Sequence, residues 1–286
     1  MSSFPARPAL RFCGVLLLTL ALVAGVVLAP SAEARQRNLV VFGDSVVADP
    51  PLGEYLGRKV ERGSSESTDA RFCPTSESNF GVRAADLLGL SAADYSCSGA
   101  TATGTSSFFG GGQTIAVQVD RALADGALGP DTARVVVSIG FNDTYSNTGL
   151  PDEEIRARFV ESVVPQIGRV RAAAPHARVQ VVGYATITDG DHVCLFNAGG
   201  ELRDRTYAPQ VGRWEQLAQD MQRDLAAASG SEFLDLKPST AGRGMCAPDH
   251  LRNWAGIVDF NASPNNLPFH MNARGHGHVA DVVARS

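Results

Sequence analysis

Short apolar runs rich in β-branched residues alternate along the chain with longer segments in which apolar residues recur every three or four positions. The short runs predict buried strands, and the longer segments predict amphipathic helices. Because each predicted strand is followed by a helix, the pattern indicates a five-stranded parallel sheet with helices on both faces. The strands are expected at 38–42, 95–97, 134–139, 179–184 and 232–236, and the helices at 80–88, 115–123, 152–173, 207–228 and 272–285.

The segment 152–173 carries the clearest helical pattern. Pro151 stands directly before it, where the fixed φ of proline suits the start of a helix. Apolar residues then recur every four positions from Ile155 to Ile167. One face of this helix is therefore expected to be buried.

Three connections between the predicted elements are longer than plain turns, at 46–79, 187–206 and 237–270. They are rich in Gly, Pro, Ser and Asn, and long ordered loops in a compact domain are commonly functional. We find no internal repeat and no linker along the chain. Residues 35–286 are therefore expected to form a single domain.

The N-terminal segment has a different composition from the rest of the chain. Arg7 and Arg11 precede an apolar stretch at 13–29, and the small residues Ala32 and Ala34 follow it. This order is typical of a secretory signal peptide, although a retained membrane anchor would carry a similar apolar run. We predict that residues 1–34 are a signal peptide and that the mature protein is secreted, either extracellular or in the cell envelope, with no membrane span.

Composition narrows the class of protein further. Of the 286 residues, 44% are hydrophobic and the formal net charge is −5, which supports a buried core and excludes a largely disordered chain. The acidic balance and the scattered basic residues argue against a nucleic-acid partner. Since only one long apolar run exists, a polytopic membrane protein is excluded as well. We expect a monomer.

The predicted mature chain contains four cysteines, Cys73, Cys97, Cys194 and Cys246. An exported protein with four cysteines typically forms two disulfides, for which three pairings exist. We favour Cys73–Cys97 and Cys194–Cys246, which join neighbours in the sequence. The spacings match no zinc-binding pattern.

Small and polar residues follow the first three predicted strands, and Ser45, Gly99 and Asn142 are among them. In an open parallel sheet these positions meet at one edge, and His270 can reach the same edge from the start of the last predicted helix. A serine hydroxyl becomes a nucleophile when a base such as histidine takes its proton. The main-chain N–H groups of Ser45 and Gly99 and the Asn142 amide can stabilise a negatively charged oxygen. This set indicates acyl transfer.

The same residues occur in the order of the SGNH hydrolases, also called the GDSL esterase/lipase family. The chain resembles that family at Gly43-Asp44-Ser45, at Gly99, at Gly140-x-Asn142-Asp143 and over 270–276, which is similar to the family's last block, His-Pro-Asn-x-x-Gly-His. The four cysteines and the residues around Gly99 resemble the secreted bacterial branch of esterases and lipases. The resemblance implies a flavodoxin-like three-layer α/β/α sandwich, ester hydrolysis through an acyl-serine intermediate, and no cofactor.

One departure from the family pattern affects the chemistry. Leu267 stands where the family usually has the aspartate that orients the histidine. Because some family members use a main-chain carbonyl instead, we predict that the carbonyl of Leu267, or of its neighbour Asn266, accepts the imidazole proton of His270. Asp249 or Asp259 can alternatively fold in from the preceding loop. Two milder departures, Val46 for leucine and Met271 for proline, are expected to be tolerated.

Other candidate residues have plainer interpretations. Asp44 and Asp143 are better suited to bracing loops by hydrogen bonds than to reacting. His276 and His278 form an H-x-H pair, but no carboxylate stands at ligand spacing, so we interpret them as helix-surface residues and expect no metal. Phe108 lies on a glycine-rich loop after Gly99 and can line an acyl pocket or cap the sheet.

The sequence therefore predicts a secreted serine ester hydrolase that acts on acyl esters, either lipids or small esters. In this hypothesis Ser45 attacks, His270 moves the proton, and Ser45, Gly99 and Asn142 hold the oxyanion. Three alternatives remain open: a polysaccharide O-deacetylase with the same site, a catalytically impaired cell-envelope binding protein, and a metal-dependent hydrolase that uses His270, His276 and His278.

Overall fold

The computed structural model describes residues 1, 37–62, 69, 72–104, 113–200, 202–263 and 266–286. The predicted signal peptide at 1–34 lies outside these residues except for Met1, and Phe108 also lies outside them. Within 36–286, the described residues form one compact unit. Among all the described residues, no helix combines the length and the apolar character that a membrane crossing needs.

Five strands form the central sheet: β1 (Asn38–Gly43), β2 (Ser91–Asp94), β3 (Thr132–Ser138), β4 (Arg178–Val182) and β8 (Glu232–Leu234). Their spatial order is β2-β1-β3-β4-β8, and every neighbouring pair is parallel. The first strand thus lies inside the sheet, and the later strands extend it in both directions, which is the flavodoxin-like order. The predicted five-stranded parallel sheet is confirmed.

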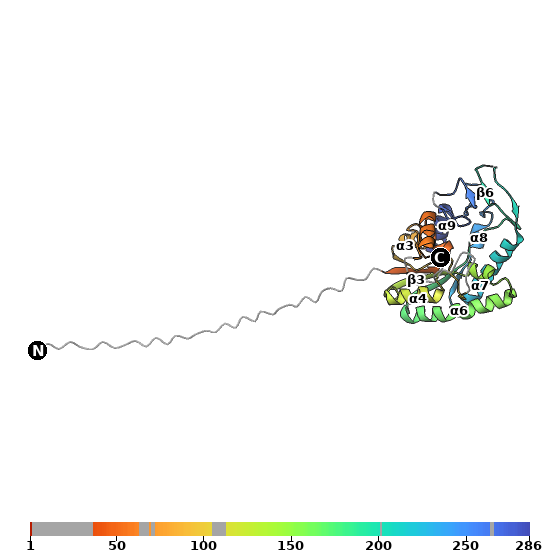
Figure 1. Cartoon of the computed structure of the whole chain (residues 1–286). Coiled ribbons are helices and arrows are strands. Elements are labelled where there is room, and N and C mark those ends of the chain that lie inside the picture. The colour runs from red at the N-terminus through yellow and green to blue at the C-terminus, as the bar shows by residue number, and fades with distance from the viewer. Residues whose placement is uncertain (2–36, 63–68, 70–71, 105–112, 201, 264–265) are drawn as a thin grey trace. The chain divides into compact units, whose positions relative to one another are not determined.

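Helices cover both faces of this sheet, so the fold has three layers (Figure 1). Successive side chains of a strand point to opposite faces, and both faces are buried here. Val40 and Phe42 of β1 pack in one core, whereas Leu39 and Val41 pack in the other. The helices of the first core are α4 (Ile115–Ala124) and α6 (Asp152–Ala173), those of the second are α3 (Phe80–Leu87) and α9 (Ala273–Arg285), and α7 (Pro209–Ser229) contributes to both.

The second strand lies four residues earlier than predicted. We expected it at 95–97, but β2 consists of Ser91–Asp94, whose two alanines and aspartate have low strand propensity. The hydrogen bonds that β2 forms with β1 at the edge of the sheet outweigh this low propensity. The Tyr95 and Cys97 N–H groups still bond to main-chain carbonyls of β1 at 2.9 and 3.1 Å, so the predicted run continues the strand direction.

The three long connections contain short elements that the sequence pattern did not predict. A further short helix, absent from the predicted elements, directly follows β3. These elements are α1 (Ser45–Ala48), α2 (Leu52–Arg62), α5 (Phe141–Ser146), α8 (Lys237–Thr240), β5 (His192–Val193), β6 (Phe196–Asn197), β7 (Thr206–Tyr207) and β9 (Val258–Asp259). Three of these elements, α1, α2 and α5, contribute residues to the site described below.

Two disulfides tie these connections to the rest of the fold. Cys73–Cys97 joins the connection before α3 to the segment after β2, and Cys194–Cys246 joins the segment after β5 to the loop after α8. Each closes a loop of tens of residues, which in the chain-entropy model stabilises the fold by roughly 3–4 kcal/mol. The disulfides therefore anchor long loops that have little regular structure.

Candidate active site

Ser45 lies just beyond the carboxyl end of β1, at the first position of α1. The turn into α1 requires glycine at position 43, because a Cβ there would lie 2.6 Å from the Ser138 carbonyl oxygen. The Asp44 carboxylate caps α1 by accepting a hydrogen bond from the Val46 N–H at 2.9 Å. This local structure presents the Ser45 hydroxyl at the sheet edge where ligands bind in open α/β folds.

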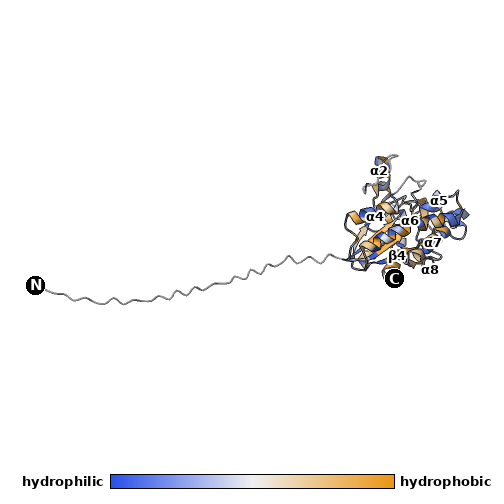
Figure 2. Ribbon diagram, turned by 90° about the horizontal axis from the view of Figure 1, so that it is seen from below, coloured by the Kyte–Doolittle hydropathy of each residue, from blue (hydrophilic) through white to orange (hydrophobic). Residues whose placement is uncertain are grey.

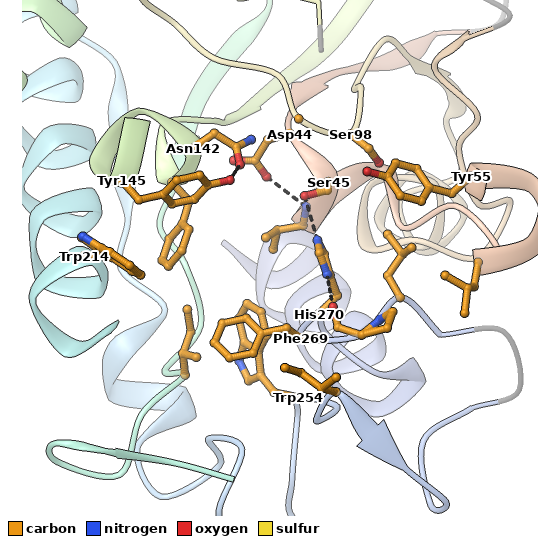
Figure 3. A pocket seen from close by; sticks show the side chains of 18 of the residues that line it. Asp44, Ser45, Tyr55, Ser98, Asn142, Tyr145, Trp214, Trp254, Phe269 and His270 are labelled. Atoms are coloured by element: carbon orange, nitrogen blue, oxygen red, sulfur yellow. Dashed lines mark hydrogen bonds between the residues drawn. The ribbon is translucent and has the colours of Figure 1, made fainter. Parts of the chain in front are cut away.

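His270 reaches the Ser45 hydroxyl from the other end of the chain. Its Nε2 lies 2.7 Å from Ser45 Oγ, and its Nδ1 lies 2.9 Å from the Pro268 carbonyl oxygen (Figure 3). Because a carbonyl only accepts hydrogen bonds, this contact places the imidazole proton on Nδ1. Nε2 then carries the lone pair that can accept the serine proton.

The carbonyl at the imidazole is not the one that the sequence predicted. We expected the carbonyl of Leu267 or Asn266, but the Leu267 carbonyl accepts a hydrogen bond from the Asn266 side-chain amide at 2.8 Å. Phe269 has a φ of 63°, a left-handed conformation that is rare for an aromatic residue. This turn sets the Pro268 carbonyl, two residues before His270, against the ring. The acceptor is therefore Pro268, which corrects the prediction.

The alternative carboxylates, Asp249 and Asp259, bind Arg252 and not the imidazole. Arg252 is buried, and its guanidinium lies 3.0 Å from Asp249 and 3.1 Å from Asp259. Ala255 lies three residues after Arg252, and its N–H donates to the His270 carbonyl oxygen at 2.8 Å. The buried ion pairs thus hold the backbone segment against which His270 is fixed.

Gly99 and Asn142 line the same pocket as Ser45. Gly99 has a φ of 80°, which glycine adopts without steric cost. Asn142 lies in the first turn of α5, where its amide nitrogen donates to the Ala100 carbonyl oxygen at 2.7 Å and its Oδ1 accepts from the Tyr145 hydroxyl. These contacts fix the orientation of the carboxamide. Since the amide nitrogen carries two hydrogens, the second can bind an oxygen in the pocket.

Two buried aspartates brace the loops around the site, in agreement with their interpretation from the sequence. The Asp143 carboxylate accepts a hydrogen bond from the Ala102 N–H at 2.9 Å, and burial raises its pKa. Asp44 accepts from the Tyr184 hydroxyl at 2.5 Å, and burial raises the pKa of Asp44 to about 7. The Tyr184 oxygen in turn accepts from the Phe141 N–H at 3.0 Å. Tyr184 thereby links the turn that carries Ser45 to the helix that carries Asn142.

Burial lowers the pKa of His270 below its usual 6.5. A general base works only when it is neutral, so we expect kcat/KM to fall as the pH drops through this lowered pKa and to have its acidic midpoint below pH 6.5. A kcat/KM profile from pH 4 to pH 8 on a soluble p-nitrophenyl ester measures this midpoint.

Asp44 also titrates near this range, so Asp44→Asn is the matched control. Asparagine caps helices as well as aspartate does, and it carries no charge to titrate. The acidic limb is expected to persist in Asp44→Asn. A midpoint at or above pH 6.5 in both proteins contradicts the lowered pKa of His270, and a profile without an acidic limb contradicts its assignment as the base.

His276 is not a surface residue, so that prediction is wrong. It is 1% exposed, its Nδ1 accepts from the Phe80 N–H at 3.1 Å, and its Nε2 lies 3.2 Å from an Asp49 carboxylate oxygen. His278 is half-buried and contacts the Ser239 hydroxyl at 3.1 Å. His276 therefore joins α9 to α3 and α1.

Both ring nitrogens of His276 have protein partners, so neither is available as a metal ligand. Within the described ranges, no three His, Cys, Asp or Glu side chains are grouped to hold a metal ion.

A pocket of about 760 Å³ surrounds the Ser45–His270 contact. Figure 3 shows Tyr145 and Trp214 on one side of Ser45, Tyr55 on the other, and Trp254 and Phe269 beyond His270. The sequence pattern does not single out these aromatic residues, because they come from separate elements and meet only in the folded chain. The other lining residues are Asp44, Val46, Leu52, Leu56, Ser98, Gly99, Phe141, Asn142, Ile187, Ile257, Leu267 and Pro268.

A flavodoxin-like sandwich with a serine–histidine contact at the carboxyl edge of its sheet, in a pocket that Gly99 and Asn142 also line, has the architecture of a serine-type hydrolase. The comparison with known families agrees. Residues 41–278 match the GDSL-like Lipase/Acylhydrolase family, and the chain belongs to this family. It is a carboxylic ester hydrolase.

One relative agrees with this assignment, and two solved structures share the fold. The chain is 28% identical to "Lipase 2" of Streptomyces coelicolor over 237 residues, which cover 73% of this chain and 75% of the relative. Phospholipase A1 from Streptomyces albidoflavus shares the fold at a TM-score of 0.56 and 21% identity, covering 87% of this chain and 99% of that one. An extracellular lipase from Streptomyces rimosus shares it at a TM-score of 0.52 and 19% identity, covering 87% and 98%.

Proposed function

We propose that Ser45 and His270 are the catalytic pair of this ester hydrolase. The 2.7 Å contact between Ser45 Oγ and His270 Nε2 carries the proposal. Nε2 takes the hydroxyl proton as Oγ attacks the ester carbonyl carbon, and it returns the proton to the alcohol oxygen when the bond to that oxygen breaks. The products are a free alcohol and an acyl-serine ester. A water molecule then repeats both steps, releases the carboxylic acid and restores Ser45.

Three donors are proposed for the negative oxygen that forms during each attack. They are the main-chain N–H groups of Ser45 and Gly99 and the side-chain amide of Asn142, which line one pocket. The Pro268 carbonyl accepts from Nδ1 and so stabilises the positive charge that develops on His270. A neutral carbonyl gives less electrostatic help than the carboxylate of a full triad. We therefore expect the enzyme to work as a Ser–His dyad and to have a modest turnover rate.

The walls of the pocket favour esters of longer acyl chains, as in lipids. Its lining includes the apolar and aromatic side chains of Leu52, Leu56, Phe141, Ile187 and Trp214. A polysaccharide O-deacetylase needs a short acyl slot and a polar cleft, whereas most of this pocket is lined by apolar and aromatic side chains. The relative from Streptomyces coelicolor, named Lipase 2, is consistent with this choice of substrate.

A chain-length series tests the choice of substrate. We expect kcat/KM for p-nitrophenyl esters to rise from acetate toward octanoate by up to about fourfold per methylene, since burying one CH₂ stabilises the complex by about 0.8 kcal/mol. The rise is expected to stop when the chain fills the pocket. Highest activity on acetate, combined with release of acetyl groups from a polysaccharide, favours the deacetylase instead.

We also propose that the enzyme is exported after removal of residues 1–34. The charged, apolar and small-residue order of that segment supports export, and so do the two disulfides, which persist in oxidising compartments. N-terminal sequencing of the protein recovered from the culture medium or cell envelope tests this. A sequence starting near Arg35 is the expected result, and an intact N-terminus contradicts it.

A further inference from the structure

Exposed apolar side chains gather on two segments at the mouth of the active-site pocket. On α2, Leu56 is 53% exposed and Val60 is 83% exposed. Near β9, Ile257 is 54% exposed and Phe260 is 73% exposed. Leu56 and Ile257 also line the pocket, so both segments border its opening. We call α2 and the segment 257–260 together the apolar rim.

The first part of the rim, α2, is an amphipathic helix whose apolar side chains are not buried in the hydrophobic core. None of the α2 side chains that the structure describes is buried, and Figure 2 shows α2 projecting beyond the layered part of the fold. Leu52, Tyr55 and Leu56 stand at positions i, i+3 and i+4, so they share one face of the helix, and this face lines the pocket. An amphipathic surface helix normally buries its apolar stripe against the core. In α2 the stripe borders the pocket mouth instead.

The second part of the rim, the segment 257–260, is anchored to the protein by an ion pair and a main-chain hydrogen bond. Asp259 binds the buried Arg252 guanidinium, and the Phe260 N–H donates to the Asn197 carbonyl oxygen at 2.9 Å. The Phe260 ring contacts Phe196 of β6 at a centroid distance of 6.5 Å, and Phe196 is itself 39% exposed. The buried ion pair thus supports apolar side chains that point to solvent. Scattered exposed apolar residues are ordinary, but a cluster around an apolar opening marks an interaction site.

We propose that the apolar rim docks on the surface of a lipid aggregate. This inference rests on the proposed function, because the partner is chosen by the continuity of the rim with the pocket in which esters are cleaved. An acyl chain that enters between Leu56 and Ile257 passes from the lipid layer to Ser45 without exposure to water. The charges on α2 have both signs, and Arg58 pairs with Glu61 at 2.9 Å, so the rim does not select an anionic surface. The partner is a neutral or zwitterionic lipid surface.

Binding of the Ser45→Ala protein to phosphatidylcholine vesicles tests the proposal without turnover. We add Val60→Ser and Phe260→Ser in this background, since neither residue lines the pocket. Leu87→Ser on α3, which removes a side chain that is 58% exposed, is the matched control. We expect the rim double variant to lose at least about tenfold in vesicle partitioning, because each side chain contributes buried apolar area, and the control to bind as the parent does.

The active protein provides the second readout. With Ser45 intact, the rim double variant is expected to hydrolyse soluble p-nitrophenyl butyrate at the parental rate and to lose activity only on aggregated long-chain esters. Equal vesicle binding by rim and control variants overturns the proposal. A concentration-dependent dimer that the rim variants abolish also overturns it, because the rim then binds a second copy of the chain. If instead the parent cleaves no long-chain ester in solution, the proposed substrate is wrong, whatever the vesicles show.

Discussion

Replacing Ser45 with alanine is expected to lower kcat/KM for ester hydrolysis by about 10⁴- to 10⁶-fold, the range found when the nucleophile of a serine hydrolase is removed. The reason is chemical: the Ser45 hydroxyl, 2.7 Å from His270 Nε2, is the group that this base deprotonates in the proposed mechanism. The fold is expected to persist, because alanine fits the first turn of a helix and the Asp44 cap remains. Steady-state kinetics with p-nitrophenyl butyrate and a thermal melt measure both effects.

Covalent labelling separates loss of the nucleophile from general damage to the site. A fluorophosphonate is expected to label the native protein at Ser45 and to leave Ser45→Ala unlabelled. Ser98→Ala is the matched control, because Ser98 also lines the pocket but its hydroxyl makes no hydrogen bond within the described part of the chain. It is expected to keep labelling and most activity. Labelling that survives in Ser45→Ala, or a folded native protein that never reacts, contradicts the assignment and favours a binding protein.

Much of the fold could be predicted because its signals are local. The helix predicted at 152–173 has the bounds of α6, since its start at Pro151 and its apolar repeat lie in one short stretch of sequence. Ile155, Phe159 and Ile167 are all buried in the structure. The positions of Ser45, Gly99 and Asn142 were predictable for a related reason: in a parallel sheet, whatever follows the strands meets at one edge.

The imidazole acceptor shows what local signals cannot supply. The Pro268 carbonyl faces the His270 ring at a turn in which Phe269 adopts a positive φ. A positive φ is uncommon for residues other than glycine, so the sequence gives no reason to expect it at Phe269. His276 escaped prediction for the same kind of reason, since its partners Phe80 and Asp49 are distant in sequence. In both cases tertiary packing decides a side chain's environment, and a family pattern alone does not reveal it.

The helix α2 is a different kind of omission. Its residues have a clear helical repeat of apolar positions, but they lie inside a connection that composition marks as a loop. None of its described side chains is buried, so α2 does not belong to the hydrophobic core that the sequence pattern predicts. Leu52, Tyr55 and Leu56 become meaningful only when the pocket beside them is known. The motifs of this enzyme therefore give little indication of α2 or of the side of the pocket that it lines.

Replacing Asn142 with alanine is expected to lower kcat by about 10²- to 10³-fold, the cost of one lost oxyanion donor. The effect arises in the transition state, because the carbonyl oxygen gains its negative charge only during attack. KM is therefore expected to change little while kcat falls. Michaelis–Menten analysis on p-nitrophenyl butyrate measures the two constants separately.

The substitution also removes two contacts that shape the pocket, so a control is needed. Asn142 Nδ2 donates to the Ala100 carbonyl, and the Tyr145 hydroxyl donates to Asn142 Oδ1. Tyr145→Phe deletes the second contact and leaves the carboxamide nitrogen in place, so it is expected to cost less than about tenfold in kcat. If Tyr145→Phe is as damaging as Asn142→Ala, the carboxamide acts by shaping the pocket and the oxyanion is held elsewhere. If Asn142→Ala raises KM with kcat intact, Asn142 binds the ground-state ester and not the transition state.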